Sequence, residues 1–456
     1  MPLAEMQNMC YDVRQESFHI FHHPEDIMRL NLKRTALVGL AFLSICTFWG
    51  LYDFVVPLLL RNTYGLGDTF SGAVMAMDNV VALFLLPFFG TLSDKCTLRF
   101  GRRMPFILCG TVCAAALLVY MPTAIGFNSL PLFLVMLALL LLAMGSYRSP
   151  AVALMPDVTP KPLRSSGNAV INLMGAIGTV ASLGLIQVAV IRTTDEAGVV
   201  RSDYSLLFYL VAAIMVICIA VLVATIRERK LALPPDEPEA PAATDGPTAV
   251  MHKLRPEVKR SLALLLVSVA LWFMGYNAVT SAFSKYALAV WGVSESAAAG
   301  CVMVASVGAI VSYWPVAMLA SRFGRKKLIL SGIVMLLAAF LFACSMPQMN
   351  AMAYVAFVVV GCGWAAINVN SYPMVVEMAS GADTGKYTGY YYTFSMTAQV
   401  LTPILSGALL EHIGYWTLFP YAAVMVVLAF ITMSFVRHGD NRPAAPKGLE
   451  ALDVEA

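Results

Sequence analysis

The chain has 456 residues, of which 59% are hydrophobic and only 12% are charged, and its mean hydropathy is +0.75. Soluble domains average about 25% charged residues, so this composition excludes an ordinary water-soluble protein and indicates an integral membrane protein. The net charge of +3 gives no reason to expect nucleic-acid binding, and the nine cysteines lack the spacing of a disulfide framework or a metal site.

Apolar runs long enough to cross a bilayer recur along the chain, since a transmembrane helix needs about 20 apolar residues. Six runs precede a polar break, at 36–60, 70–92, 104–123, 131–155, 166–191 and 204–226. Six more follow it, at 261–290, 296–320, 328–346, 350–374, 387–410 and 416–436. We therefore predict an all-α membrane protein with twelve transmembrane helices.

The polar segments divide the chain into an N-terminal tail, a six-helix bundle, a linker, a second six-helix bundle and a C-terminal tail, at 1–34, 35–226, 227–260, 261–436 and 437–456. The linker is charged and then rich in Pro and Ala, which is typical of a flexible segment. Placing both termini in the cytoplasm puts 25 of the 30 Lys and Arg residues on that side. The positive-inside rule therefore predicts a multi-pass cell-membrane protein with cytoplasmic termini.

The two bundles carry an internal repeat. The string RFGRR at 99–103 recurs as RFGRK at 322–326, and the same offset of 223 residues carries Pro150 onto Pro373. Two six-helix halves repeated in parallel are the architecture of major facilitator transporters, which bind substrate near the membrane midplane between the halves.

The segment between the second and third predicted helices reads PFFGTLSDKCTLRFGRRMPFI at 87–107. It resembles the loop 2–3 signature of major facilitators, but six residues instead of two separate Asp94 from Gly101. That spacing is similar to the glycoside–pentoside–hexuronide cation symporters, and most closely to the sucrose transporters. Segments 49–66 and 148–164 share this resemblance, which is specific over about 45–170 and generic in the second half. It implies the major facilitator fold and sugar transport.

The loop predicts a cytosolic gating motif. Gly90 would allow close approach of predicted helices 2 and 11, and Asp94 would accept hydrogen bonds from the basic cluster. The expected members are Gly90, Asp94, Gly101, Arg102, Arg103, Asp157 and Arg164. In the second half Ser321 replaces the acid and Ala317 the glycine, which predicts an asymmetric latch. Alternatively, the positive charges only keep the loop inside.

Three charged residues lie within predicted helices, where each costs about 2.5–3.5 kcal/mol to insert. They are the coupling candidates Asp53, Asp78 and Arg148. The resemblance implies that Arg148 corresponds to the arginine that sucrose transporters use for substrate and coupling. The acid that those proteins carry eleven positions earlier is Leu137 here, so Asp53 or Asp78 would carry the proton. A structural ion pair is the alternative interpretation.

Sodium coupling is disfavoured because melibiose-type relatives use two carboxylates one turn apart on helix 2. This chain offers only Asp78 with Asn79. Lys285 and Glu377 lie close to helix ends, so we interpret them as interfacial groups.

Polar and aromatic residues recur at helical spacing on several predicted helices. In lipid such stripes should face the interior, either toward a ligand or toward hydrogen-bond partners on other helices. The substrate-binding candidates are Trp49, Tyr52, Tyr147, Asn168, Asn172, Trp272, Tyr276, Asn277, Trp364, Asn368 and Gln399. Amides and aromatic rings with few charges suit a neutral polyol.

The sequence contains no nucleotide-binding GxxxxGK[ST] loop and no HExxH or GxSxG motif, so we expect neither ATP-driven transport nor an enzyme. We predict a proton-coupled sugar or glycoside symporter that works by alternating access. Its expected partners are the sugar and the lipid bilayer, it needs no cofactor beyond the proton or sodium, and a monomer suffices. The alternatives are a proton-coupled exporter of amphiphiles, a sodium-coupled sugar symporter and a receptor that has lost transport.

Overall fold

The computed structural model describes residues 30–98, 100–160, 163–194, 200–231, 255–378 and 384–440. Within them, twelve helices are long and apolar enough to cross a membrane. The first six are α2 (Leu32–Leu58, continued by η1, Leu59–Thr63), α3 (Asp68–Asp94), α4 (Met104–Gly126), α5 (Leu130–Val158), α6 (Arg164–Ala189) and α7 (Ser205–Thr225). The other six are α9 (Pro256–Ala289), α10 (Glu295–Phe323), α11 (Arg325–Ser345), α12 (Ala351–Val376), α13 (Thr384–His412) and α14 (Leu418–Ser434). The prediction of an all-α, twelve-helix membrane protein is confirmed.

Polar residues between the apolar runs define where several helices begin. The side chain of Asn31 accepts a hydrogen bond from the Arg34 backbone N–H at 3.0 Å and so caps α2. Ser294 and Asn350 cap α10 and α12 in the same way. Such caps satisfy the N–H groups that a helix start leaves unpaired. Between α10 and α11, Gly324 adopts φ +90°, a conformation that favours glycine.

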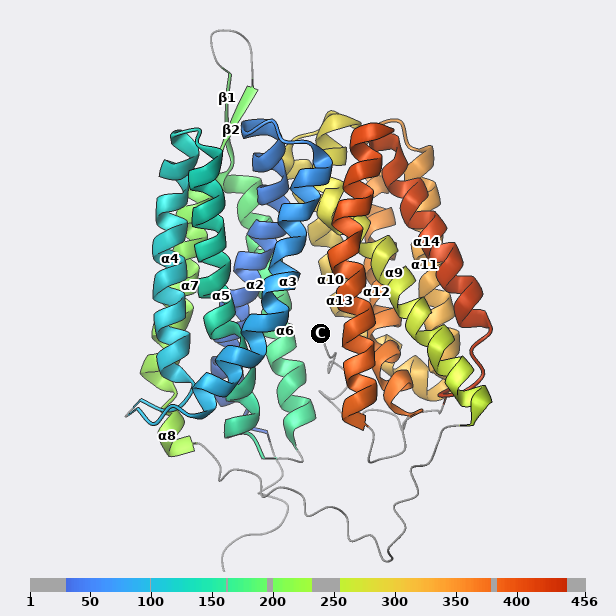
Figure 1. Cartoon of the computed structure of the whole chain (residues 1–456), viewed down its shortest axis with the longest axis horizontal. Helices are drawn as coiled ribbons and strands as arrows, with labels where there is room; N and C mark the ends of the chain where they lie inside the picture. Colours follow the sequence, from blue (N-terminus) through green and yellow to red (C-terminus); the bar gives the residue numbers. More distant parts are fainter. Residues whose placement is uncertain are drawn as a thin grey trace, which may run out of the picture.

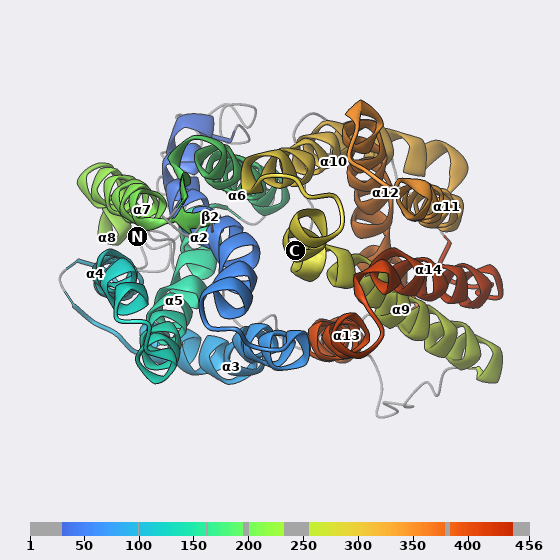
Figure 2. The same ribbon diagram turned by 90° about the horizontal axis from the view of Figure 1, so that it is seen from above.

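The helices form two bundles, and the packing within one bundle repeats in the other (Figure 1). In the first half α2 packs on α6 and α7, as α9 packs on α13 and α14 in the second. Likewise α5 contacts α3 and α4, as α12 contacts α10 and α11. The halves meet along α3 and α13 on one side, along α6 and α10 on the other, and between α2 and α9 (Figure 2). The parallel repeat in the sequence is thus a repeat of packing.

The structure also contains elements that the sequence did not predict. Between α6 and α7, β1 (Ile191–Thr194) and β2 (Val200–Asp203) form an antiparallel hairpin. We call this end of the molecule the hairpin end, and the opposite end, where α2 begins and α14 ends, the tail end (Figure 1). The short helix η4 (Tyr415–Thr417) precedes α14 at the hairpin end.

The predicted linker is shorter than expected at both edges. Its first residues form α8 (Glu228–Leu231), and α9 already begins at Pro256, a residue that suits the first turn of a helix. Residues 232–254 of this linker, 1–29 of the N-terminal tail and 441–456 of the C-terminal tail lie outside the described residues.

Candidate functional site

A polar cavity of about 240 Å³ lies between the two halves. Its walls come from α2, α3 and α5 of the first half and from α9 and α13 of the second. The lining residues are Trp49, Asp53, Met75, Asp78, Asn79, Arg148, Asn277, Thr280, Ser281, Gln399 and Pro403. The structure thus brings together all three coupling candidates and three of the substrate-binding candidates, whose roles remain predictions.

The charged side chains in this central cavity are held by different neighbours. The Asp78 carboxylate accepts hydrogen bonds from the backbone N–H and the side-chain amide of Asn79, at 2.6 and 2.7 Å. The Arg148 guanidinium lies 5.7 Å from the centre of the Trp49 ring, within range of a cation–π contact. Asp53 is exposed to the cavity. Within the described part of the chain, no ion pair joins Arg148 to either carboxylate, which leaves all three charges able to contact a ligand.

Two hydrogen-bond donors at the cavity lack a protein partner among the described residues. They are the indole N–H of Trp49 and the side-chain amide nitrogen of Asn277, both buried. A buried donor without a partner costs about 1–3 kcal/mol, a cost that a ligand oxygen would remove. Next to Asn277, the Tyr276 ring stacks on Trp364 at 3.8 Å with an interplanar angle of 7°, which joins α9 to α12.

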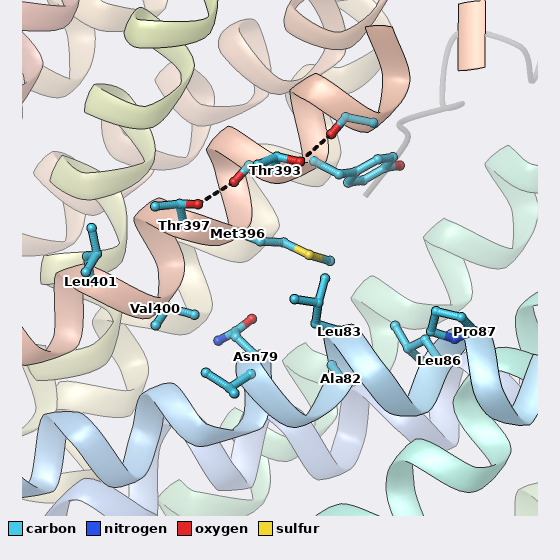
Figure 3. Close-up of a pocket in the computed structure, with 13 residues that line it drawn as sticks. Asn79, Ala82, Leu83, Leu86, Pro87, Thr393, Met396, Thr397, Val400 and Leu401 are labelled. Carbon is cyan, nitrogen blue, oxygen red and sulfur yellow. Dashed lines mark hydrogen bonds between the residues drawn. The ribbon is translucent and has the colours of Figure 1, made fainter. Parts of the chain in front are cut away.

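A second cavity, of about 630 Å³, lies between α3 and α13 (Figure 3). We call it the α3–α13 cleft. Its walls are mainly apolar, and it is lined by Asn79, Val80, Ala82, Leu83, Leu86, Pro87, Gly389, Tyr392, Thr393, Met396, Thr397, Val400 and Leu401. Asn79 lines this cleft and the central cavity, so the two spaces adjoin.

At the hairpin end, a buried ion cluster centred on Asp68 joins the two halves. The Asp68 carboxylate accepts hydrogen bonds from Lys285 at 2.8 Å, from Arg61 at 3.1 Å and from the Tyr415 hydroxyl. The side chains of Asp68 and Lys285 are only 6% and 4% exposed. Because Lys285 and Tyr415 belong to the second half, these contacts hold α3 against α9 and the start of α14.

A second cluster at the same end centres on Glu295, at the start of α10. Its buried carboxylate pairs with Arg192 of the hairpin and accepts a hydrogen bond from Ser202 at 2.6 Å. Burial and the neighbouring Glu295 carboxylate both raise the pKa of the Tyr204 hydroxyl, which therefore stays neutral and donates to Glu295. In both clusters an acid of one half holds a cation of the other.

We call this set of contacts the hairpin-end seal. Its members are Arg61, Asp68, Thr69, Arg192, Ser202, Tyr204, Lys285, Glu295, Glu411 and Tyr415, with the Thr69 N–H donating to Glu411 at 2.8 Å. Here the helices also approach at backbone distance: a Cβ at Gly72 would overlap the Pro403 carbonyl, and one at Gly407 would overlap the Asp68 carbonyl. Toward the tail end the two bundles diverge (Figure 1).

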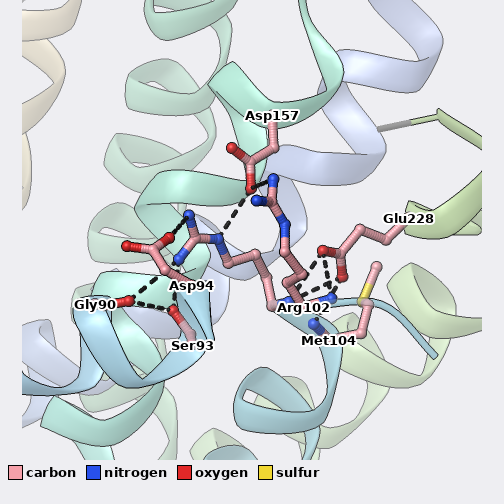
Figure 4. A network of polar contacts seen from close by, with 8 residues as sticks. Gly90, Ser93, Asp94, Arg102, Met104, Asp157 and Glu228 are labelled. Atoms are coloured by element: carbon pink, nitrogen blue, oxygen red, sulfur yellow. Dashed lines mark hydrogen bonds and ion pairs between the residues drawn. The ribbon is translucent and has the colours of Figure 1, made fainter. Parts of the chain in front are cut away.

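At the tail end, the predicted gating motif forms a network within the first half (Figure 4). The Arg103 guanidinium pairs with Asp94 at 2.5 Å and with Asp157 at 2.9 Å, and it donates to the Ser93 hydroxyl. Arg102 pairs with Asp157 at 3.4 Å. The network ties α3, α4 and α5 together.

Glu228, which the sequence analysis did not identify, completes this network. From α8 its carboxylate accepts hydrogen bonds from the backbone N–H groups of Arg102, Arg103 and Met104 at 2.8–3.0 Å (Figure 4). It thereby caps α4 and places a negative charge at the helix start, where the helix dipole favours it. Gly101 adopts φ +120° beside this carboxylate, and a Cβ there would overlap it.

One expectation for the motif was wrong. Gly90 approaches α5, where a Cβ would lie 2.8 Å from the Ser149 hydroxyl, and not α13. The Arg164 guanidinium donates to the Thr159 carbonyl at 3.3 Å, and its membership of the motif stays a prediction. The second half has its own ion pair, between Arg325 and Glu377, so Glu377 is not simply an interfacial group.

The comparisons with known proteins agree with this architecture. Residues 38–436 match the family model for MFS/sugar transport proteins. The chain belongs to the MFS/sugar transport protein family. This confirms the resemblance to major facilitator sugar transporters that the loop 2–3 signature indicated, and it places the chain among transport proteins, not enzymes.

Two curated relatives match shorter segments of this MFS/sugar transport protein. Sucrose transport protein SUC3 of Arabidopsis thaliana is 31% identical over 138 residues, which cover 26% of this chain and 23% of SUC3. Proton-associated sugar transporter A of Homo sapiens is 44% identical over 55 residues, covering 12% of this chain and 7% of that protein. The matched segments thus span less than a quarter of the relatives' own length.

Solved structures share the fold at low sequence identity. A D-xylose-proton symporter aligns with a TM-score of 0.62 and 15% identity over 90% of this chain and 98% of that one. The nucleoside transporter NupG aligns with a TM-score of 0.59 and 16% identity over 90% and 100% of the respective chains.

Several substrate-binding candidates of this MFS/sugar transport protein lie away from the central cavity. Tyr52, Tyr147 and Trp272 are fully buried, at 0% exposure, so in this conformation they cannot contact a ligand. Asn368 lines a separate cavity of about 280 Å³ beside Arg325 at the tail end. Asn168 and Asn172 are half-buried on α6, outside the set that lines the central cavity, as are Tyr276 and Trp364, which form the aromatic stack.

The interpretation of Lys285 as an interfacial residue was also wrong. Its ammonium group does not extend to the surface but pairs inside the hairpin-end seal. As for metals, no three His, Cys, Asp or Glu side chains of the described ranges come together as a metal site.

Proposed function

We propose that this MFS/sugar transport protein moves a sugar or glycoside across the cell membrane by alternating access, driven by a proton gradient. The observation that carries the proposal is the central cavity, where two carboxylates and one guanidinium meet amide groups between the two halves. Intramembrane charges are costly, and they commonly mark the path of a substrate or a coupling ion.

The positive-inside rule supports an orientation with the tail end in the cytoplasm. In that orientation the hairpin-end seal closes the path to the outside, and the central cavity communicates with the cytoplasm. The structure then represents the inward-facing step of transport. In the outward-facing step, the seal opens and α3 and α13 approach at the tail end.

Sugar recognition in this proposal uses hydrogen bonds from both halves. Arg148 offers a fork of donors, Asn277 and Gln399 offer amides that both donate and accept, and the Trp49 ring can cover an apolar sugar face. The unpartnered donors of Trp49 and Asn277 would each gain a sugar oxygen.

The proton would bind Asp53 or Asp78. An ionised carboxylate attracts the Arg148 guanidinium, whereas a protonated one releases it to bind the sugar. Return of the proton to the cytoplasm would restore that attraction and weaken sugar binding. The name of one matched relative, proton-associated sugar transporter A, supports the proton coupling, and that of another, a sucrose transport protein, supports a sugar as the substrate.

Uptake into proteoliposomes tests the proposal. With the outside acidified, wild-type protein should accumulate labelled sucrose, glucose, galactose or xylose, and a protonophore should abolish accumulation. Asp78→Asn or Asp53→Asn should lose accumulation while keeping exchange of labelled for unlabelled sugar. Asp203→Asn, in an exposed carboxylate outside the cavity, is the matched control. Accumulation driven by sodium instead of protons, or no sugar uptake at all, would overturn the proposal.

Proton-driven export of amphiphiles is the second candidate, and the apolar α3–α13 cleft favours it. A proton-driven exporter moves protons inward as it moves substrate outward. Acidifying the outside would therefore drive amphiphiles that carry no sugar out of the vesicle lumen. The same proteoliposomes, loaded with a fluorescent amphiphile, distinguish the two candidates by the direction of transport.

A further inference from the structure

We propose that the α3–α13 cleft is a binding subsite for an apolar substituent of the transported sugar. The preferred substrate is then an amphiphilic glycoside, with its sugar in the central cavity and an alkyl or aryl group in the cleft. This inference rests on the proposed function and adds the class of substrate.

The lining of the cleft suits an apolar group. Leu83 and Leu86 of α3 face Met396, Val400 and Leu401 of α13, and none of the thirteen lining residues is charged (Figure 3). Moving apolar surface from water into such a space is favourable roughly in proportion to the area buried.

The border between polar and apolar space runs through consecutive residues of both helices. On α3, Asp78 lines the central cavity, Asn79 lines both spaces and Val80 lines the cleft; the Asn79 amide donates to Asp78 at 2.7 Å. On α13, Gln399 lines the central cavity and Val400 the cleft. One molecule can therefore place polar and apolar parts on the two sides of a single boundary.

The sizes of the two spaces agree with a shared occupant. The central cavity, at about 240 Å³, is smaller than the roughly 300–1,000 Å³ typical of pockets for drug-sized ligands. The cleft adds about 630 Å³. The two walls of the cleft belong to different halves, which move against each other in alternating access. The cleft therefore changes its width during transport, which suits a group that is part of the transported molecule and enters and leaves with it.

Uptake of paired glycosides into proteoliposomes tests the inference. The probes are the methyl and phenyl glycosides of glucose, galactose and xylose. For the sugar that is carried, the phenyl glycoside should show a half-saturating concentration about tenfold or more below that of the methyl glycoside. In equilibrium binding to purified protein, which does not require the cleft to close, Leu83→Trp or Val400→Trp, which fill the cleft, should remove this difference while keeping the affinity for the methyl glycoside, which also verifies folding.

Phe84→Trp is the matched control, because Phe84 neighbours Leu83 on α3 but is 68% exposed and does not line the cleft. This variant should keep the phenyl preference. Equal affinities for methyl and phenyl glycosides would overturn the inference, as would a phenyl preference that survives both cleft variants, since partition into the bilayer then explains it. A phospholipid that copurifies with wild type and is lost from Leu83→Trp, seen by native mass spectrometry, would also overturn it. Failure to transport any of the six probes would instead count against sugar transport itself.

Discussion

Arg148 is the basic residue that lines the central cavity. Its guanidinium lies over Trp49 and in the same cavity as Asp53 and Asp78. Arginine keeps its charge at any physiological pH, so the two carboxylates are the groups that can change protonation. The planar fork can bind two hydroxyl oxygens at once, or a carboxylate when no sugar is present.

Replacing this fork by a single ammonium group should weaken sugar binding while keeping the charge. A hydrogen bond to a charged group contributes about 1.5–3 kcal/mol, so Arg148→Lys should raise the dissociation constant for the sugar about 10- to 100-fold. Isothermal titration on purified protein measures it, with Arg229→Lys on the exposed face of α8 as the control. Unchanged affinity in Arg148→Lys would show that the guanidinium does not contact the sugar.

Individual residues also show which parts of the candidate site could be predicted from the sequence. Asp53, Asp78 and Arg148 could be recognised because a charged residue inside an apolar run stands out in the sequence alone, and the structure places all three in one cavity. Trp272 and Tyr147 could not be placed, because whether a helical side chain faces a cavity or a neighbouring helix depends on packing. Lys285 was misread because its partner Asp68 lies 217 residues away.

Among the helices, α3 is the element on which both ends of the molecule depend. At the hairpin end its first residue, Asp68, holds the second half through Lys285 and Tyr415, whereas at the tail end its last residue, Asp94, pairs with Arg103 of the same half. Removing one partner of a buried ion pair typically costs about 3–5 kcal/mol, because the other charge remains buried and unpaired.

The hairpin-end seal should therefore open when Asp68 loses its charge. Asp68→Asn leaves the buried Lys285 without its counter-charge and should shift the protein toward the conformation that is open at the hairpin end. Adding Lys285→Met should restore much of the closed population. Spin labels at Phe127 and Trp416, both exposed at this end, would report the opening as a longer distance.

Asp203→Asn again serves as the control, since that residue lies at the same end outside the seal. If Asp68→Asn and the double variant gave the same label distances as wild type, the ion pair would not hold the seal closed.

The elements were more predictable than their contacts. Twelve apolar runs and the repeated RFGR string indicated two parallel halves, because the length of each apolar run and the offset between the repeats can be read directly from the sequence. The β1–β2 hairpin and the cap that Glu228 places on α4 escaped prediction, since each depends on a partner in another element. For the same reason Gly90 was assigned to the wrong neighbouring helix.

For the molecule as a whole, one end should close when the other opens. The seal contacts between the halves lie at the hairpin end. The α3–α13 cleft extends along α3 from Asn79 toward the tail end. If the halves rock as rigid bodies, breaking the seal should narrow the cleft.

Cysteines introduced by Leu86→Cys and Met396→Cys, on opposite walls of the cleft, test this coupling. In a background without the native cysteines, adding Asp68→Asn should increase the rate at which this pair forms a disulfide. The labels at Phe127 and Trp416 should move apart in the same protein. Opening at both ends together, with slower disulfide formation, would contradict rigid-body rocking.

The composition of the hairpin-end seal has a consequence for the response to voltage. Its three basic side chains, Arg61, Arg192 and Lys285, face three carboxylates, Asp68, Glu295 and Glu411. Each elementary charge that crosses the bilayer field feels about 2.3 kcal/mol per 100 mV, but a gate whose charges cancel feels little net force. The electrical driving force should therefore act mainly on the charges of the central cavity. The sugar-induced capacitive current that reports proton entry, measured on a solid-supported membrane, should vanish when Asp53→Asn and Asp78→Asn are combined.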